Sequence, residues 1–252
     1  MGTPRFFSPE PLRPALSAGL PVCLSENAAR HAGRVLRLRE GDDLVLFDGV
    51  GGEYAARIAS VERERVTVEL LAWHDVECES PLRLTLIQAL QSGEKMDMTV
   101  QKAVELGVSR IVPVASRRSV VRLEGERAKR RVEHWRGVAV AACEQCGRNR
   151  VPEVADLQAL DRWLGEAAKG DALRLMFAPG GERSLDQVLS GHRGSIELLI
   201  GAEGGLAPDE LAKAEAAGYV PIRLGPRILR TETAGLAALA AIQCLCGDFT
   251  GR

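Results

Sequence analysis

The chain has 252 residues, and its 46% hydrophobic and 27% charged residues are typical of a globular protein with one large or two modest domains. No apolar run approaches the roughly 18 residues that a membrane span needs. The first 20 residues contain four prolines and no apolar segment of a secretory signal, so we expect a cytoplasmic protein. The formal net charge of −1 argues against nucleic-acid binding over the whole surface.

Positive charge is nevertheless concentrated in two blocks of the sequence. Residues 1–39 carry a net charge of +4 and residues 110–136 a net charge of +6, nearly all of it from arginine. Such blocks are commonly solvated faces, but arginine also suits bidentate contact with phosphate. A local phosphate-binding surface is therefore one interpretation of both blocks.

The first 73 residues predict a small β-rich domain of barrel-like size. Ser25 is a suitable N-cap for a helix that ends by Gly41. Alternating or β-branched apolar residues then predict strands at 43–48, 53–61 and 65–71. Residues 74–81 are acidic and end in Ser-Pro, so they are interpreted as a linker.

Residues 82–252 alternate strands with helices, which predicts an α/β domain with a mostly parallel sheet and helices on both faces. We expect strands at 82–90, 110–114, 173–177, 196–200 and 219–224. We expect helices at 95–106, 126–146, 184–189, 208–217 and 231–246.

Six cysteines raise the question of a metal or redox site. Cys143 and Cys146 have the spacing of a zinc or redox half-site, and Cys244 and Cys246 offer two further thiols. Both pairs lie in helical patterns rich in alanine and leucine, where cysteine is most often a small buried apolar residue. We therefore expect no metal.

Two glycine-bearing segments near the C-terminus, residues 198–206 and 224–235, carry the strongest functional signal. Each is a short apolar strand that stops at glycine before a helix, which exposes backbone N–H and C=O groups to a ligand. Their spacing matches neither a dinucleotide-binding G-x-G-x-x-G nor a Walker loop, so a pyrophosphate cradle is not expected. Ile228 and Leu229 beside free backbone groups suit a neutral adenine ring better. Capped turns would explain either segment alone, but the pair favours a single pocket.

These segments carry a resemblance to a known family. Leu224–Ala234 (LGPRILRTETA) and Ile200–Leu206, with Gln88–Val112 (QALQSGEKMDMTVQKAVELGVSRIV) and Glu144–Arg148 (EQCGR), resemble the 16S ribosomal RNA uracil-N3 methyltransferases of the SPOUT superfamily. Arg5-Phe6-Phe7 and Phe47-Asp48-Gly49 resemble that family's N-terminal domain, so the similarity spans nearly the whole chain. Ala202 stands where the family usually has proline, and Cys146 where it usually has serine.

The resemblance implies a fold, a cofactor and partners. The expected fold is a PUA-like RNA-binding β-barrel at 1–73, a linker at 74–81, and a SPOUT methyltransferase domain at 82–252 with a deep trefoil knot. The expected cofactor is S-adenosylmethionine, bound in the knot. The expected partners are a second copy of the chain, as a homodimer, and 16S ribosomal RNA within the 30S subunit.

The resemblance also implies site residues. The cofactor would be bound by residues of both segments, namely Gly201, Glu203, Gly204, Gly205, Leu224, Gly225, Ile228, Leu229, Arg230 and Thr233. Methyl transfer to uracil N3 requires a ring anion to form or begin to form, so donors aimed at O2 and O4 would contribute most. Our hypothesis assigns this role to Arg230 and Arg227. Glu232 is a weaker candidate for the base, since an acid at a helix start also satisfies free N–H groups.

Four arginines are candidates for RNA contact: Arg5, Arg34, Arg37 and Arg148. Three other functions stay open from the residues. The chain could be a SPOUT methyltransferase that acts on another RNA nucleotide. It could be a non-catalytic RNA-binding adaptor, although an adaptor needs no cofactor pocket. It could also be a nucleotide-dependent enzyme of doubly wound fold, although the phosphate fingerprint is missing.

Overall fold

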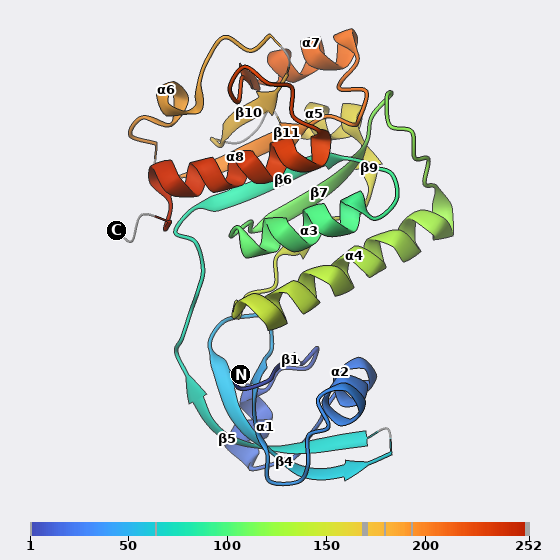
Figure 1. The fold of residues 1–252 in the computed structure, drawn as a ribbon, viewed down its shortest axis with the longest axis vertical. Coiled ribbons are helices and arrows are strands. Elements are labelled where there is room, and N and C mark those ends of the chain that lie inside the picture. The colour runs from blue at the N-terminus through green and yellow to red at the C-terminus, as the bar shows by residue number, and fades with distance from the viewer. Residues whose placement is uncertain (1, 64, 168–170, 179, 193, 250–252) are drawn as a thin grey trace. The chain divides into compact units, whose positions relative to one another are not determined.

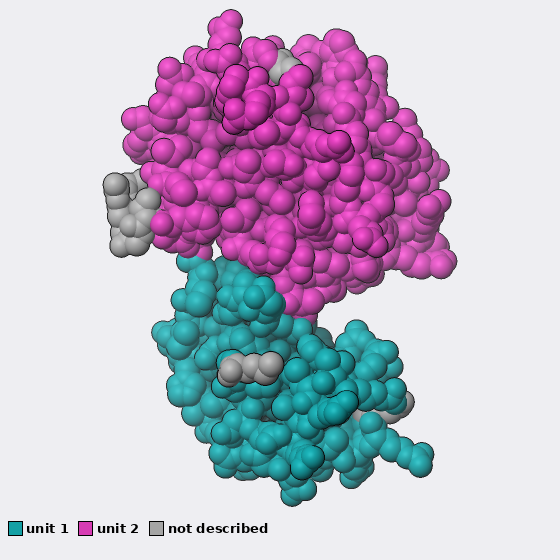
Figure 2. Space-filling model, viewed as in Figure 1, with its two compact units in different colours: residues 1–79, 143–151 teal, residues 80–142, 152–252 magenta. Residues whose placement is uncertain are grey.

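The computed structural model of the chain describes residues 2–63, 65–167, 171–178, 180–192 and 194–249. These residues form two compact units, which Figure 2 shows in different colours. The first unit comprises residues 1–79 and 143–151, and the second comprises residues 80–142 and 152–252. The sequence predicts that residues 143–151 belong to the C-terminal domain, whereas in the structure they group with the first unit.

A five-stranded sheet in the order β1-β3-β4-β5-β2 forms the framework of the first unit (Figure 1). Its strands are β1 (Arg5–Phe7), β2 (Val22–Cys23), β3 (Asp43–Phe47), β4 (Glu53–Glu62) and β5 (Arg65–His74). Strands β1 and β3 pair in parallel, and the other pairs are antiparallel. Alternate side chains of β3, β4 and β5 point into one apolar core, as the period of two in the sequence predicts.

Short helices accompany this sheet. They are α1 (Arg13–Ala18), α2 (Glu26–Arg30) and a π-helical continuation, η1 (His31–Val35). The hydroxyl of Ser25 accepts the N–H of Ala28, so the predicted N-cap is confirmed. The helical stretch ends at Val35 rather than near Gly41, and Arg37 follows with a left-handed φ of 57°.

Residues 143–151 are bound to the first unit through a set of polar contacts. The N–H of Phe7 donates to Glu144 Oε1 at 2.9 Å, and Asn149 Nδ2 donates to the Val76 carbonyl at 2.6 Å. The Arg148 guanidinium donates to both oxygens of Glu79. Burial raises the pKa of Glu144 above its ordinary value, although the Phe7 N–H opposes that rise. The segment is thus held by the strands and the linker of the first unit.

The second unit is built on a seven-stranded sheet in which every strand pair is parallel. The order is β12-β10-β11-β6-β7-β8, and β9 also pairs with β7. The strands are β6 (Arg83–Ala89), β7 (Arg110–Ala115), β8 (Glu153–Val154), β9 (Gln158–Ala159), β10 (Leu173–Phe177), β11 (Ser195–Ile200) and β12 (Val220–Ile222). The α/β class with a mostly parallel sheet is therefore confirmed.

Helices cover both faces of this sheet. They are α3 (Lys95–Glu105), α4 (Gly125–Cys146), α5 (Leu160–Ala167), α6 (Leu185–Leu189), α7 (Pro208–Ala216) and α8 (Thr231–Cys246). Ile87 and Leu199 share a core with α5 and α7. The alternate side chains Leu86 and Ile200 face Gly235 of α8 on the other side, where α3 packs against α8 (Figure 1).

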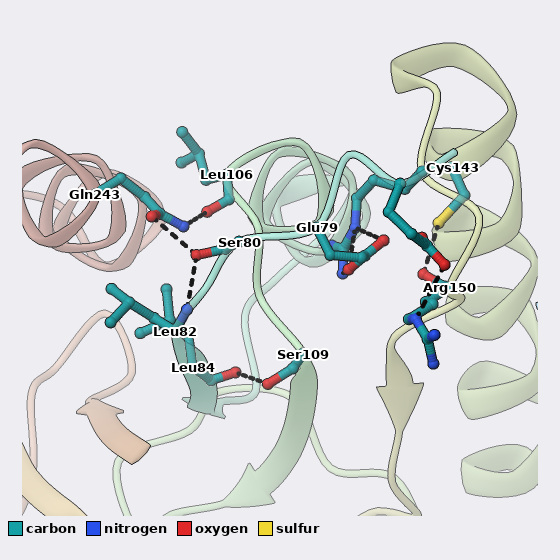
Figure 3. A network of polar contacts seen from close by, with 11 residues as sticks. Glu79, Ser80, Leu82, Leu84, Leu106, Ser109, Cys143, Arg150 and Gln243 are labelled. Atoms are coloured by element: carbon teal, nitrogen blue, oxygen red, sulfur yellow. Dashed lines mark hydrogen bonds and ion pairs between the residues drawn. The ribbon is translucent and has the colours of Figure 1, made fainter. Parts of the chain in front are cut away.

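The C-terminal turn of α8 is anchored to the beginning of the sheet (Figure 3). Gln243 is fully buried, and its Nε2 donates to the Leu106 carbonyl at 2.9 Å while its Oε1 accepts the Ser80 hydroxyl at 3.0 Å. Gly107 follows α3 with a φ of +79°, and a Cβ there would lie 2.6 Å from Gln243 Nε2. Glycine adopts this φ without strain and leaves room for the Gln243 amide, which suits it to the position just after α3.

Candidate active site

The first glycine segment leaves the sheet at the end of β11 and turns back at once. The N–H of Gly205 donates to the Ala202 carbonyl at 2.8 Å, and Gly205 has a left-handed φ of +70°. A Cβ on Gly201 would lie only 3.0 Å from the Gly205 carbonyl carbon, so glycine is needed for this close backbone approach. Backbone groups of a tight turn therefore lie at the carboxyl end of a central parallel strand, where α/β proteins commonly bind ligands.

The second glycine segment runs from β12 to α8 and is tied to the first by Thr231. Thr231 Oγ1 donates to the Gly201 carbonyl at 2.5 Å and accepts Gln88 Nε2 at 3.0 Å. Thr231 is 7% exposed and Gln88 is fully buried. One hydroxyl thus joins the start of the last helix, the loop after β11 and the central strand β6.

The two segments line one cavity of about 650 Å³, as the sequence predicted. It is lined by the predicted residues Gly201, Glu203, Gly204, Gly205, Ile228, Leu229, Arg230 and Glu232. A smaller cavity of about 210 Å³ adjoins it and is lined by the predicted residues Leu224, Gly225, Arg227, Ile228 and Leu229. Thr233 is exposed on the first turn of α8 and contributes to the lining of neither cavity.

The two cavities differ in character. The smaller one has apolar walls that include Phe177 and Ile222, and Arg223 and Arg227 also line it. The larger one contains charged side chains of both signs, namely Lys95, Arg118, Glu203, Arg230 and Glu232. Because Phe177, Ile228 and Leu229 belong to both linings, the two form one elongated site, and its larger part, with both carboxylates, is called the charged end.

Lys95 organises the carboxylates at the charged end. Its Nζ lies 3.5 Å from Glu232 Oε1 and 3.6 Å from Glu203 Oε1. The Ser92 N–H and hydroxyl also donate to Glu203 Oε1, at 3.0 and 2.8 Å. Partial burial opposes ionisation of Glu203, but the hydrogen bonds and Lys95 hold its pKa below the ordinary value. This carboxylate is therefore ionised and fixed in place.

Glu232 and Arg230 line the larger cavity, and Arg227 lines the smaller one. The Glu232 side chain is 12% exposed, and its buried Oε2 has no hydrogen-bond partner among the described residues. Arg230 and Arg227 are exposed, and within the described chain neither guanidinium has a recorded hydrogen bond or ion pair. One uncompensated cation thus lies in the same cavity as the Glu232 carboxylate, and the other lies in the adjoining cavity.

Sequence reasoning missed Lys95 and Arg118 as site residues. Arg118 Nη1 donates to the Gly204 carbonyl at 2.9 Å and lines the larger cavity. Lys95 lies in the first turn of α3, where the helix dipole favours anions rather than cations. A lysine at this unfavourable position was the signal that could have pointed to a functional role. Arg118 was counted in the second arginine block but carried no positional signal.

The four arginines predicted to contact RNA fall into two groups. Arg148 is 4% exposed and bound to Glu79, while Arg5 is bound to Glu53, Asn149 and the Gly147 carbonyl. Guanidinium groups held in this way stabilise the first unit and present little surface to a phosphate. For Arg5 and Arg148, the structure therefore favours a structural role over the predicted contact with RNA. Arg34 and Arg37 are exposed near the end of η1, so a phosphate can reach them.

The cysteine pairs do not assemble. All six cysteines are free, and no group of three or more metal-ligating side chains exists in the part of the chain that the structure describes. Burial raises the pKa of the Cys143 thiol to about 12. Cys143 is therefore a neutral, packed side chain at the end of α4.

None of the described helices is both long enough and apolar enough to cross a bilayer.

Comparisons with known proteins cover both units. A family model described as an RNA methyltransferase domain matches residues 78–243, and one described as an RNA methyltransferase PUA domain matches residues 24–71. The ribosomal RNA small subunit methyltransferase E of Buchnera aphidicola is 31% identical over 229 residues, which cover 91% of this chain and 92% of the relative.

Two solved structures are similar to the whole fold. The ribosomal RNA small subunit methyltransferase E of Neisseria gonorrhoeae, bound to S-adenosylmethionine, is 42% identical with a TM-score of 0.91, and the match covers 98% of this chain and 100% of that one. A putative methyltransferase of Legionella pneumophila with bound S-adenosylmethionine is 35% identical with a TM-score of 0.91, covering 99% and 100%.

Proposed function

We infer that this chain, which belongs to the ribosomal RNA small subunit methyltransferase E family, transfers the methyl group of S-adenosylmethionine to N3 of a uridine in 16S ribosomal RNA. The observation that carries this function is the elongated site, which the two glycine segments line and whose larger end holds the carboxylates. Adenine, which is planar and neutral, suits the smaller end, where Phe177, Ile222 and Leu229 give apolar walls. The sulfonium and the amino-acid portion suit the charged end.

The residues of the site fit the cofactor, and different residues contact its different parts. Bound S-adenosylmethionine supplies the electrophilic methyl group. Leu224, Gly225, Ile228 and Leu229 offer backbone groups and apolar surface to adenine, and Gly201 permits the close approach of the Gly205 backbone that shapes the turn beside it. Glu203, fixed by Ser92 and Lys95, places negative charge near the cationic end of the cofactor.

The reaction also needs groups that act on uracil. Loss of the N3 proton leaves negative charge on O2 and O4, and Arg230 and Arg227 stabilise this charge in the transition state. Glu232 is the weaker candidate for the group that takes the proton, and Lys95 then positions its carboxylate. Arg34 and Arg37 contact phosphates of the RNA and contribute to binding rather than to the chemical step.

We further propose the finer features of the fold and assembly. The segment from β12 to α8 threads through a trefoil knot, which accounts for the contact between Thr231 and Gly201. The first unit closes as a PUA-like barrel, with domain boundaries near residues 73 and 82. The enzyme works as a homodimer in the cytoplasm, where its substrate is the RNA of the small ribosomal subunit.

Two measurements test this function. Mass spectrometry of 16S ribosomal RNA from cells with and without the gene should show N3-methyluridine only in the former. Calorimetric titration should detect binding of S-adenosylmethionine and S-adenosylhomocysteine but not of NAD. Unchanged N3-methyluridine in the cells that lack the gene would contradict the proposed substrate, and binding of NAD alone would contradict the proposed cofactor.

A further inference from the structure

The arginine-rich block 110–136 divides into neutralised and uncompensated side chains. Five of its basic residues pair with carboxylates, namely Arg110, Arg117, Lys129, Arg131 and Arg136. Arg118 and Arg122 donate only to backbone carbonyls. Arg127 and Arg130 have no recorded hydrogen bond or ion pair with any described residue. Four guanidinium charges thus lie uncompensated on the loop after β7 and the first turns of α4.

A second cavity, separate from the cofactor site, lies beside these charges. It has a volume of about 420 Å³, within the range typical of small-molecule sites, and it is lined by Leu90, Gln91 and Gly93, by the loop before α4 and by α4 itself. Leu90, Val121, Leu123 and Trp135 give it apolar walls, and Arg127 and Arg131 add guanidinium groups. Leu90 and Trp135 are each 1% exposed, so these walls are fixed parts of the core.

The two arginines of this cavity are in different states. Arg131 is held by Asp97 at 3.2 Å and by the Gly93 carbonyl at 3.3 Å, and it lies over the Trp135 ring. Asp97 neutralises its charge. Arg127 is exposed and uncompensated, so it is the cation at this cavity that an anionic ligand can engage.

One buried side chain links this cavity to the site of methyl transfer. Gln91 lines the cavity, and its Nε2 contacts Thr231 Oγ1 at 3.4 Å, while Thr231 lines the larger cofactor cavity. Gln91 is 3% exposed, and its Oε1 accepts the Thr99 hydroxyl at 2.9 Å. The two cavities are therefore neighbours, separated by the Gln91–Thr231 contact.

We propose that this second cavity binds an unpaired nucleotide of the RNA next to the methylated uridine, with the base between the apolar walls and its phosphate on Arg127. The proposal rests on the methyltransferase function proposed above. RNA is the occupant that the charges favour, because a polyanion suits a segment that carries four uncompensated guanidinium groups, one of them at this cavity. A base splayed out of a single strand suits an apolar pocket, and its phosphate suits a guanidinium.

The test uses the full-length protein and small ribosomal subunits from cells that lack the gene. Affinity for these subunits is measured with saturating S-adenosylhomocysteine, whose own affinity is measured by calorimetry. Arg127→Ala removes the cation at the cavity. Lys129→Ala is the matched control, because this substitution removes one positive charge from the same helix. The Lys129 side chain is 74% exposed and does not line the cavity. Leu123→Trp fills the cavity without a change of charge.

We expect Arg127→Ala and Leu123→Trp each to weaken subunit binding about tenfold, and Lys129→Ala less than about twofold. All three variants should bind S-adenosylhomocysteine as the wild type does. Equal losses for Arg127→Ala and Lys129→Ala would reduce the effect to general electrostatics and overturn the proposal. Wild-type binding by both Arg127→Ala and Leu123→Trp would do the same.

Two further outcomes separate this proposal from its premises. If the wild-type protein does not methylate the subunits, the proposed function itself fails. If Leu123→Trp changes the oligomeric state in light scattering, the cavity is an interface between copies of the chain and the proposal is wrong. Arg127 is exposed, so Arg127→Ala keeps the test decisive even if Leu123→Trp does not fold.

Discussion

Replacing Thr231 with valine tests whether one hydroxyl holds the cofactor site together. Valine has nearly the same shape as threonine, so Thr231→Val removes the three hydrogen bonds of this hydroxyl without opening a cavity. The Gly201 carbonyl loses its hydroxyl donor at 2.5 Å, and Gln88 Nε2 loses its acceptor at 3.0 Å. Since both groups are buried, the change acts on the folded state.

The magnitude follows from the two shorter bonds, because the third, from Gln91 Nε2 at 3.4 Å, is long and weak. A buried carbonyl left without its donor costs about 1–3 kcal/mol. Gln88 Nε2 keeps its hydrogen bond to the Ala89 carbonyl at 3.1 Å. The loss of its bond to Thr231 therefore adds only about 1 kcal/mol. We therefore expect Thr231→Val to lower the free energy of unfolding by about 2–4 kcal/mol. We also expect weaker binding of S-adenosylhomocysteine, because the loop 201–206 is no longer tied to α8.

The assay is urea unfolding with a matched threonine on the same helix as the control. Thr233 is exposed, so Thr233→Val should change the free energy of unfolding by less than about 0.5 kcal/mol. Calorimetry then gives the affinity of Thr231→Val for S-adenosylhomocysteine. If Thr231→Val unfolds with the wild-type free energy and binds the ligand equally well, the hydroxyl does not join the segments and the reasoning fails.

Three further predictions concern the chemistry and the titrating groups. Arg230→Ala should lower the single-turnover rate at saturating cofactor by about 10²-fold or more, and an unchanged rate would remove Arg230 from the mechanism. Since the pKa of Glu203 is lowered on folding, ionised Glu203 stabilises the fold above its unfolded pKa. The stability difference between wild type and Glu203→Gln should therefore shrink as pH falls below about 5, and a constant difference in acid unfolding experiments would contradict this. Buried Cys143, with a pKa of about 12, should resist iodoacetamide at pH 8 while exposed Cys23 reacts, as peptide mass mapping can show.

The sequence predicted the parts of the fold that have a strong periodic or compositional signal. Helix α8 spans Thr231–Cys246 as expected, because a long run rich in alanine and leucine follows the strand and the glycine segment. Strands β8 and β9 have only two residues each, which is too short for any hydrophobic period to be recognised. Helix α5 is short and contains Gly165, a weak helix former, and it was missed for that reason.

The candidate site was predicted in outline, but its charged part was not. Glycine turns at the ends of apolar strands are local features, so the two segments and their shared cavity could be predicted from the sequence. Lys95 reaches this cavity from α3, more than a hundred residues earlier in the chain, and no local pattern reports such a contact. Arg148 was assigned to RNA for the same reason, since only the fold shows that Glu79 holds it.

The position of Thr231 in the chain has a consequence for protein synthesis. Strand β6, which supplies Gln88, is made 143 residues before the helix that supplies Thr231. The cofactor cavity therefore cannot form on a growing chain until nearly all of it has left the ribosome. A product truncated before α8 would retain all the described strands of the sheet but lack Thr231, Glu232 and the helix that carries them. Such a fragment would not compete for S-adenosylmethionine, so the order of residues itself restricts cofactor binding to completed molecules.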